Sequence, residues 1–356
     1  MATDSRDSPG AGAVSGLMAG SSLPADTMRA VMVRVPGGPQ ALERVRIPEP
    51  RPSPGEVRVR AQAIGVGKPD VMVRRGIYPW MPPLPAIPGN ELAGVIDAVG
   101  PGVEIPRPGD RVLVSSRELA QRGGCYAEAI CVPADAVYAL PASVSAVDAV
   151  ALGNYQLALA LLFEAGAVAP RSVLVHGAAG GVGTALLQTA RARGMLAIGV
   201  ASNARKCAFA RAAGASHMID RSMEDVRSRV HELTGGTGVD MVLDPIGGPG
   251  FTDGLDLLAA RGTLMSYGIM RGLPDKNLLG ELRRLLGRSL AIRSYSIHAL
   301  DHEPALRRSL MIQAIDLVAS GAIVPPAATI FRLDEVREAH ETLDAAQVLG
   351  KLVLIP

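Results

Sequence analysis

The chain has 356 residues, which is enough for two domains with their own hydrophobic cores. Hydrophobic residues make up 48% of it and charged residues 20%, so the composition excludes an intrinsically disordered chain. Because 36 basic and 34 acidic side chains leave a net charge of only +2, and aromatic residues make up only 3%, we expect neither a nucleic-acid partner nor a membrane surface as partner.

The first 27 residues combine charged residues with a run rich in Gly, Ser and Ala, and they lack a clear apolar core. We therefore expect a flexible tail over residues 1–27 rather than a signal peptide, or alternatively a translation start at Met28. Three scattered cysteines, Cys125, Cys131 and Cys207, are too few for a disulfide framework or a four-thiolate zinc site. They predict a reducing, cytoplasmic location.

Between Met28 and about Leu140, short apolar segments alternate with Gly and Pro, which is typical of a β-rich domain. We expect its strands at residues 30–35, 56–63, 91–99, 111–115 and 126–132. The Pro-rich stretch from Tyr78 to Pro88 cannot be a helix interior, so it predicts an extended surface loop.

From about residue 145 the pattern changes to helix-length apolar periodicity over residues 146–165, and then to an alternation of strands and helices. Strands are expected at 172–176, 196–200, 218–220 and 239–244, with helices at 182–193, 204–213 and 225–233. Repeated βαβ units of this kind predict a parallel, doubly wound sheet. The last quarter predicts helices at 303–320 and 333–343 and a closing strand at 351–355.

A glycine-rich turn follows the strand expected at 172–176 and precedes a helix. Glycine there allows a tight turn and lets backbone N–H groups approach a pyrophosphate at the positive end of the helix. We therefore expect Ala179, Gly180, Gly181 and Val182 to bind a dinucleotide. The alternative is a structural turn whose glycines serve packing alone.

The end of the second strand of such a unit distinguishes NAD from NADP, because an acidic residue there binds the ribose hydroxyls of NAD. This chain has no acid at that point and instead has Ser202 and Lys206, with Arg221 after the third strand. Hydroxyl and cationic groups suit a 2′-phosphate, so we expect NADPH. Arg205 is expected to be solvated rather than in contact.

Several motifs together resemble the medium-chain dehydrogenase/reductase superfamily. They lie, in the order typical of that family, at residues 88–100, 108–112, 178–183, 239–248 and 350–356. The resemblance covers Met28 to the C-terminus, and it is greatest to the zinc-independent quinone oxidoreductase (zeta-crystallin-like) branch.

The resemblance implies an α/β fold with two domains. A GroES-like, β-rich catalytic domain would comprise residues 28–148 and 294–356, and a doubly wound Rossmann domain that binds NADP would comprise residues 149–293. The active site would lie in the interdomain cleft. The resemblance also implies a homodimer or homotetramer.

The positions where zinc-dependent relatives have a Cys and a His as ligands correspond here to Gly67 and Asn90. Glycine cannot bind zinc and an amide is a poor ligand, so we expect no metal. His298 and His302 form a pair spaced by four residues, which we interpret as the solvated start of a helix rather than as a metal site.

Without a metal, hydride from NADPH suits an acceptor whose developing charge is already delocalised, such as a quinone or an α,β-unsaturated carbonyl. Tyr78 resembles in position a tyrosine near the active site of quinone oxidoreductases and enoyl-thioester reductases, so it is the expected hydrogen-bond donor to the acceptor oxygen. The alternative is a Tyr78 that only packs under the loop, with its hydroxyl in solvent.

We expect Gly67, Asp70 and Tyr155 to line the substrate pocket. Tyr267 is expected to hold the nicotinamide carboxamide through its backbone, with a side chain that serves packing. Two other functions remain open. One is an enoyl-thioester reductase of fatty-acid or polyketide type, and the other is a non-catalytic NADPH-binding redox sensor, since Gly67 stands where the branch usually has Asn.

Overall fold

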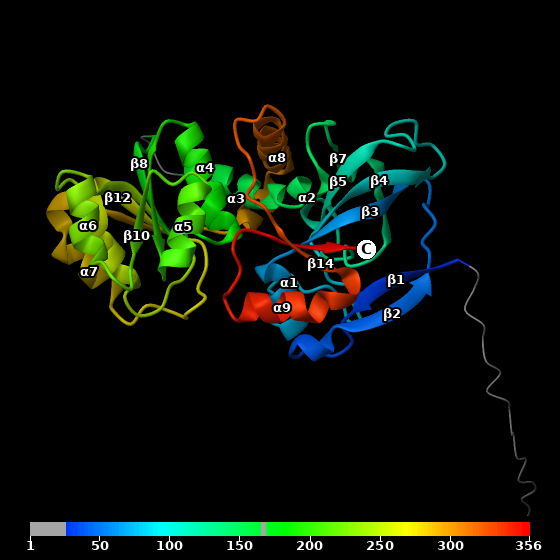
Figure 1. Ribbon diagram of the computed structural model, residues 1–356, viewed down its shortest axis with the longest axis horizontal. Coiled ribbons are helices and arrows are strands. Elements are labelled where there is room, and N and C mark those ends of the chain that lie inside the picture. The colour runs from blue at the N-terminus through cyan, green and yellow to red at the C-terminus, as the bar shows by residue number, and fades with distance from the viewer. Residues whose placement is uncertain (1–25, 165–168) are drawn as a thin grey trace, which may run out of the picture.

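The structure is a computed structural model that describes residues 26–164 and 169–356. Two large sheets lie at opposite ends of the molecule, with helices between and around them (Figure 1). The tail expected over residues 1–27 lies outside the described residues except for its last two positions. Of these, Thr27 already belongs to the first strand, β1 (Thr27–Met32).

One sheet has seven strands, which come from both ends of the chain. Its strands are β3 (Glu56–Val66), β4 (Glu91–Val99), β5 (Arg111–Ser115), β6 (Ala129–Pro133), β7 (Val137–Ala139), β14 (Thr329–Arg332) and β15 (Leu352–Ile355). Their spatial order is β14-β15-β3-β4-β5-β7, and β6 also pairs with β3. The C-terminal strand β15 therefore pairs with β3 from the N-terminal part, antiparallel to it. We call this the catalytic sheet.

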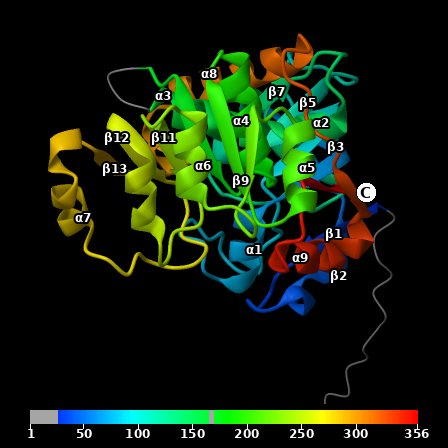
Figure 2. The same ribbon diagram turned by 60° about the vertical axis from the view of Figure 1, so that its left-hand side comes forward.

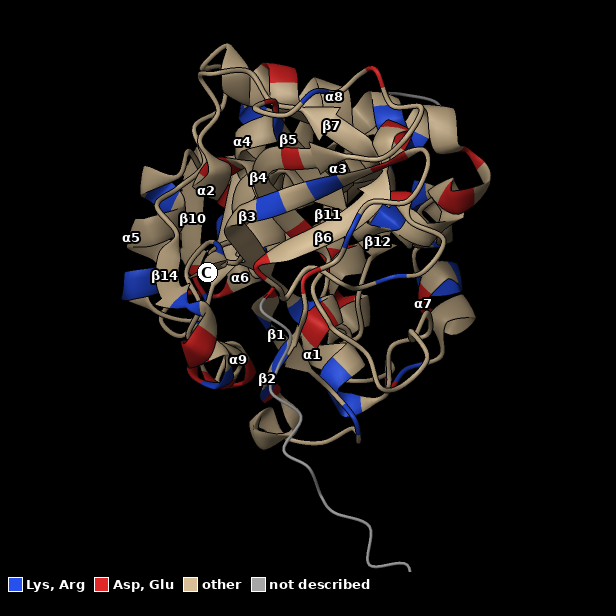
Figure 3. Ribbon diagram, turned by 90° about the vertical axis from the view of Figure 1, so that its right-hand side faces the viewer, with Lys and Arg blue, Asp and Glu red and all other residues tan. Residues whose placement is uncertain are grey.

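The strand β3 shows why these residues form a half-buried sheet. Along its first half the buried residues alternate, with Val57 and Val59 buried completely, and the polar residues between them face outward. Two of these, Arg58 and Arg60, both bond to Asp97 on β4. Figure 3 shows acidic and basic positions interspersed on this face.

The second sheet has six parallel strands in the order β10-β9-β8-β11-β12-β13. The strands are β8 (Ser172–His176), β9 (Leu196–Ala201), β10 (His217–Asp220), β11 (Val239–Asp244), β12 (Leu258–Ser266) and β13 (Ala291–Ser294). The chain runs outward from β8 to β10 and then returns to the other side of β8. This order confirms the predicted doubly wound sheet, and it places a topological switch point between β8 and β11.

Helices cover both faces of this second sheet, the Rossmann sheet. Val173 and Val175 of β8 belong to a core shared with the helices α3, α4 and α8, whereas Leu174 belongs to a core on the other face, shared with α6. The helices are α1 (Lys68–Arg75), α2 (Ala146–Ala149), α3 (Leu152–Phe163), α4 (Gly181–Ala192), α5 (Ala204–Ala212), α6 (Val226–Leu233), α7 (Leu278–Arg284), α8 (Pro304–Ala319) and α9 (Val336–Asp344). Figure 2 shows the strands of this sheet together with α4, α5 and α6.

The apolar stretch predicted as one helical region over residues 146–165 is two helices, α2 and α3, and residue 165 lies outside the described residues. By length and composition residues 146–163 are apolar enough to cross a membrane. However, 67% of this stretch is buried inside the protein, where α3 packs against α4 and α8. The two helices of this stretch are therefore part of the protein core.

Two strand predictions in the N-terminal part need correction. The strand expected at 30–35 is β1, which spans Thr27–Met32. It pairs with a strand that was not predicted, β2 (Glu43–Pro48). In β2 charged residues alternate with apolar ones, so the sequence shows no apolar run there. The strand expected at 126–132 begins only at Ala129. Tyr126 instead accepts a hydrogen bond from Val31 of β1, so the chain changes partner at this point.

The last glycine of the glycine-rich turn, Gly183, lies where the backbone leaves no room for a side chain. A Cβ atom there would lie 2.3 Å from the Gly177 carbonyl oxygen and 2.8 Å from the Ala178 Cα atom. We expect Gly183→Ala to lower the free energy of unfolding by about 1–3 kcal/mol in denaturant titrations, although alanine is the better helix former. Gly287→Ala is the control, because its Cβ would meet nothing within 4 Å. Equal stability of Gly183→Ala and the wild type would contradict the clash.

Candidate functional site

The glycine-rich turn lies where the two sheets meet. It follows β8 at the carboxyl edge of the Rossmann sheet, and Gly180 is the N-cap of α4. On its other side, the Gly350 N–H donates to the Ala179 carbonyl oxygen at 2.9 Å, just before β15 of the catalytic sheet. A ligand at this helix N-terminus would therefore touch both parts of the chain.

The predicted residues Ala179, Gly180, Gly181 and Val182 all lie in this turn or in the first turn of α4. A Cβ atom at Gly181 would lie 2.6 Å from the Asn154 amide nitrogen, so glycine is needed there for packing. A Cβ at Gly180 would have no neighbour closer than 3.4 Å. The backbone at Gly180 is thus open to a phosphate group, as a dinucleotide site requires.

Three predicted residues for the 2′-phosphate come together at the ends of β9 and β10. Ala201 pairs with Asp220 as the last residues of these strands, so Ser202 and Arg221 follow at neighbouring positions. The Lys206 ammonium donates to the Ser202 hydroxyl at 3.3 Å and to the Ala346 carbonyl at 3.0 Å. Hydroxyl and cationic groups therefore cluster at the carboxyl ends of β9 and β10.

The nearby carboxylate of Asp220 does not face this cluster as a ribose ligand would. It accepts hydrogen bonds from the backbone N–H and the hydroxyl of Ser222, within its own turn. Tyr267 lies at the end of β12, where its backbone N–H donates to the Asp244 carbonyl at 3.0 Å. Burial, and then the charge of Asp244, raise the pKa of the Tyr267 phenol, which fits a packing side chain.

Tyr78 lies in the loop that follows α1, and its hydroxyl is not in solvent. It is 3.0 Å from the His298 Nε2 atom. The Trp80 ring stacks on His298 with 3.4 Å between ring centroids. His298 lies in the short 3₁₀ segment η6 (Ile297–His302) that follows β13. Its side chain is only 9% exposed, so the interpretation of His298 as a solvated residue is wrong.

A second set of hydrogen-bonded residues, separate from Tyr78 and His298, lies at the N-terminus of α1. The buried carboxylate of Asp70 accepts hydrogen bonds from the Gly67 N–H and from the Asn90 amide, both at 2.7 Å. The Asn90 carbonyl in turn accepts from the Ser116 hydroxyl at 2.6 Å. Burial, and then the charge of Glu91, raise the pKa of Asp70 to about 7. The predicted residues Gly67 and Asp70 are therefore together, with Asp70 buried beneath the surface.

The Glu91 carboxylate and the Lys351 ammonium form a buried ion pair at 2.5 Å beside this group. A Cβ atom at Gly65 or at Gly153 would each lie 2.4 Å from a Glu91 oxygen. Both glycines therefore make room for the ion pair, one on β3 and the other on α3.

The prediction that Tyr155 lines the substrate pocket needs correction. Tyr155 is 2% exposed, and its hydroxyl donates to Gln188 of α4 at 2.6 Å. This side chain therefore packs between α3 and α4 and does not join Tyr78 or Asp70. The sequence showed the residue but not which side of α3 it occupies.

The sequence did not reveal His298, Asp301 or Arg117 as parts of the site. His298 and Asp301 are 220 or more positions from Tyr78, so no local spacing indicated the contact. Arg117 lies in the 3₁₀ turn η2 (Ser116–Glu118), and its Nη1 atom lies 3.4 Å from the Gln156 carbonyl oxygen. The best available signal was the presence of two histidines and two acidic residues within positions 298–303.

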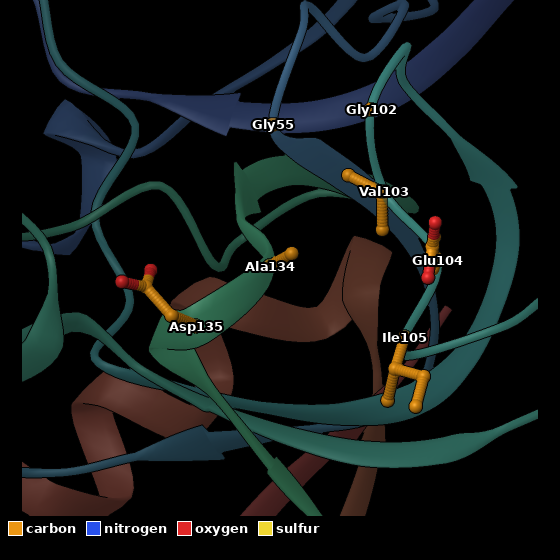
Figure 4. A pocket seen from close by; sticks show the side chains of 7 residues that line it. All are labelled: Gly55, Gly102, Val103, Glu104, Ile105, Ala134 and Asp135. Carbon is orange, nitrogen blue, oxygen red and sulfur yellow. The ribbon is translucent and has the colours of Figure 1, made fainter.

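Two surface hollows lie away from these residues. One, of about 500 Å³, is open and is lined by Gly55, Gly102, Val103, Glu104, Ile105, Ala134 and Asp135 (Figure 4). The other, of about 690 Å³, lies between the ends of α4 and α5 and residues 322–327. Neither of the two contains a predicted site residue, so the candidate site is defined by its polar contacts.

Two family models match the chain. The alcohol dehydrogenase GroES-like domain matches residues 53–142, and the zinc-binding dehydrogenase domain matches residues 181–316. These matches confirm the predicted GroES-like and Rossmann-type domains.

The side chains present at the expected metal position do not fit a zinc ion. Gly67 offers no side chain, and the Asn90 amide is already bonded to Asp70 and Ser116. Over residues 26–164 and 169–356, no group of three or more His, Cys, Asp or Glu side chains could hold a metal ion. A catalytic zinc needs three such protein ligands, so no step at this site is assigned to a metal.

Similar proteins come from bacteria and animals. The quinone oxidoreductase of Salmonella typhimurium is 36% identical over 325 residues, covering 90% of this chain and 97% of that protein. The mouse synaptic vesicle membrane protein VAT-1 homolog is 33% identical (83% and 75% covered), and a Burkholderia 2-haloacrylate reductase is also 33% identical (83% and 89%).

Solved structures of similar proteins have the same fold as this chain. The quinone oxidoreductase of Pseudomonas syringae pv. tomato has a TM-score of 0.82 and 33% identity, covering 92% of this chain and 100% of that one. The Escherichia coli quinone oxidoreductase complexed with NADPH has a TM-score of 0.80 and 31% identity, with the same coverage. The chain therefore belongs to the medium-chain dehydrogenase/reductase superfamily, in its quinone oxidoreductase branch.

Proposed function

We propose that the protein is an NADPH-dependent reductase that transfers hydride to a quinone or an α,β-unsaturated carbonyl compound. The observation that carries this proposal is the open glycine-rich turn at the switch point, with Lys206 and Ser202 clustered after the neighbouring strand β9. The E. coli relative, whose structure contains NADPH, supports the choice of cofactor. When bound, NADPH supplies the hydride.

We further propose that residues 28–148 and 294–356 form the catalytic domain and residues 149–293 the cofactor domain. Ala179, Gly180, Gly181 and Val182 would hold the pyrophosphate, and Ser202, Lys206 and Arg221 the 2′-phosphate. The backbone at Tyr267 would face the nicotinamide, because it lies at the carboxyl edge of the Rossmann sheet.

The class of hydride acceptor is inferred from the hydrogen-bond donors that the site provides. Because the side chains at the expected metal position do not fit zinc, we propose a zinc-independent reaction that needs no activated alkoxide. Quinones and enones suit such a site, since the anion formed on hydride addition is delocalised and needs only hydrogen-bond donors. Tyr78 is the proposed catalytic donor. Burial raises its pKa, which keeps the phenol protonated at neutral pH.

An acceptor panel tests the function. We expect oxidation of NADPH, followed by its absorbance, with a quinone or an enone, and a smaller rate with a crotonyl thioester. A larger rate with the thioester would favour the enoyl-thioester reductase. Tight NADPH binding without turnover of any acceptor would leave the redox sensor instead and would contradict the proposed function.

The cofactor preference is tested at Lys206. Loss of a charge-assisted hydrogen bond costs about 1.5–3 kcal/mol, so Lys206→Ala should raise the KM for NADPH by roughly 10-fold or more and change that for NADH little. The neighbouring exposed Arg205→Ala is the matched control and should change neither. An equal effect of Lys206→Ala on both cofactors would count against a 2′-phosphate contact.

We also propose a cytoplasmic homodimer or homotetramer. The outer strand β13 has little burial, and exposed apolar side chains lie near it, including Leu279 and Leu286, each 67% exposed. Figure 2 shows β13 and α7 at the same end of the molecule. An uncovered sheet edge beside apolar side chains is a ready site for self-association.

Light scattering tests this association. The wild type is expected to have at least twice the monomer mass, and Leu286→Lys should shift it toward the monomer because a charge would be buried in the interface. Val35→Lys is the control, since Val35 is similarly exposed, at 73%, but lies in the other domain. A wild type that is monomeric at micromolar concentration would contradict the proposal.

A further inference from the structure

A chain of hydrogen bonds continues inward from the Tyr78 hydroxyl. His298 lies 3.0 Å from that hydroxyl through Nε2, and its Nδ1 atom lies 3.1 Å from the Asp301 carboxylate. Arg122 donates to the same Asp301 oxygen at 2.8 Å, and Arg307 donates to the other at 3.0 Å. Asp301 is thus held from three sides, and the imidazole is held between a carboxylate and a phenol.

The carboxylate determines which way the hydrogen bonds run. Burial alone would raise the pKa of Asp301, but hydrogen bonds from Arg122 and His298 lower it overall, so Asp301 is ionised. An ionised carboxylate only accepts, so the proton of a neutral His298 must be on Nδ1. Nε2 then accepts, and the Tyr78 O–H points at His298 and away from any acceptor.

Protonation of His298 reverses the second bond. Both ring nitrogens of an imidazolium are donors, so Nε2–H would donate to the Tyr78 oxygen. The Tyr78 O–H is then free to turn toward an acceptor oxygen. The phenol is therefore a better donor to an acceptor when the imidazole behind it is charged.

We propose that Tyr78, His298 and Asp301 form a proton relay. In this relay the imidazolium of His298 returns a proton to the Tyr78 oxygen when Tyr78 donates its own proton to the acceptor. This inference rests on the proposed reductase function. Hydride brings one hydrogen nucleus and two electrons to the quinone or enone, which becomes an anion. The Tyr78 O–H bond breaks as its proton passes to the acceptor oxygen, and the His298 Nε2–H bond breaks as its proton passes to the Tyr78 oxygen. Neutral His298 then takes up a proton from solvent. A quinone has become a hydroquinone, whereas an enone has become an enol, which gains a solvent proton at its α-carbon and returns its O–H proton to solvent to give the ketone.

The position of the relay fits this role. His298 follows shortly after β13, and Tyr295 beside it donates its backbone N–H to the Ser266 carbonyl at the end of β12. The relay therefore lies next to the carboxyl edge of the Rossmann sheet, where ligands of such folds bind. Tyr78 is the catalytic residue, whereas His298 and Asp301 are positioning residues that act through it.

The charged groups around His298 come from several elements. Asp301 lies on its own segment, Arg117 lies on η2, Arg122 follows η2 in the chain, and Tyr78 comes from the loop after α1. Further out, Arg307 of α8 holds Asp301 and pairs with Glu118, and Asp70 acts on Tyr78.

These surroundings set the expected pH dependence. Burial lowers the pKa of His298 below its ordinary 6.5, and the charges of Arg117 and Arg122 act in the same direction, while Asp301 opposes them. The charged form is lost as pH rises through this pKa. The kcat for an enone should therefore fall as pH rises above it, toward a plateau for the neutral imidazole.

The stacked indole of Trp80 provides a direct readout. Trp80 is the only tryptophan in the chain. An indole face favours a cation over it, so Trp80 stabilises the imidazolium. An imidazolium also quenches a stacked indole more strongly than neutral imidazole does, because it accepts an electron from the excited ring more readily. Tryptophan fluorescence therefore reports the charge of His298 without any substrate or cofactor.

A fluorescence titration of the full chain is the first arm of the test. The wild type should brighten as pH rises, with a midpoint below 6.5. His298→Gln should abolish this transition, whereas His302→Gln, the exposed histidine of the same segment, should keep it. Asp301→Asn should move the midpoint to lower pH, because the carboxylate stabilises the charged ring. A transition that persists in His298→Gln would overturn the inference.

The pH dependence of kcat is the second arm. The midpoint of the fall in kcat with pH should coincide with the fluorescence midpoint. Both midpoints should shift together in Asp301→Asn. A purely structural role of Asp301 would not produce this joint shift. His298→Gln and Tyr78→Phe should each lower kcat about 100-fold, with the KM for NADPH unchanged. Turnover with a flat pH profile and an unaffected His298→Gln would overturn the relay alone. Absence of turnover with every acceptor would overturn the proposed function, and the relay with it.

Discussion

The buried ion pair between Glu91 and Lys351 joins the parts of the chain on which the site depends. Glu91 begins β4, and Lys351 directly precedes β15, so the pair ties the last strand to the middle of the catalytic sheet. Two charges removed from water are costly, and loss of one partner typically costs about 3–5 kcal/mol because the other charge remains buried. The neighbouring residue Gly350 bonds to the glycine-rich turn. The same pair therefore holds the cofactor turn against the catalytic sheet.

The polar side chains of the candidate site form two separate hydrogen-bonded arrays. One contains Asp70, Asn90 and Ser116, directly beside Glu91, and the other contains Tyr78 and His298. In both arrays each buried polar group is held by further hydrogen bonds, so its orientation is set before a substrate arrives. Donors that are fixed in this way stabilise a developing anion without the reorganisation that water would need. In the proposed zinc-independent reaction, these hydrogen bonds would stabilise the anion that forms when hydride is added.

The sequence was sufficient for those parts of the fold in which residues close along the chain determine the structure. The order of strands and helices from Ser172 onward follows from apolar runs and glycines, and the structure has the predicted doubly wound sheet. The strand β2 escaped prediction because its charged residues alternate with Val45 and Ile47, so no apolar run stands out. Strand boundaries also moved where the chain changes pairing partner, as at Tyr126.

Only the part of the candidate site that is built from residues close together in the sequence could be predicted. Glycine spacing and the absence of an acid near Lys206 indicated a dinucleotide turn, and the structure places those residues together. The partners of Tyr78 could not be predicted, because His298 approaches it only after the chain has passed through the whole Rossmann sheet. Tyr155 was misplaced for a related reason. Most residues of α3 are buried, so its sequence does not show which neighbouring element Tyr155 faces.

In the proposed reaction, the chain moves hydride from NADPH to carbon or oxygen of an activated acceptor while its own residues supply the proton. Reduction of an enone with NADPH deuterated at C4, followed by mass and NMR analysis of the product, tests this most directly. The product is expected to carry one cofactor-derived deuterium at the β-carbon and a solvent-derived hydrogen at the α-carbon. A product without cofactor deuterium, or with solvent hydrogen at the β-carbon, would contradict it.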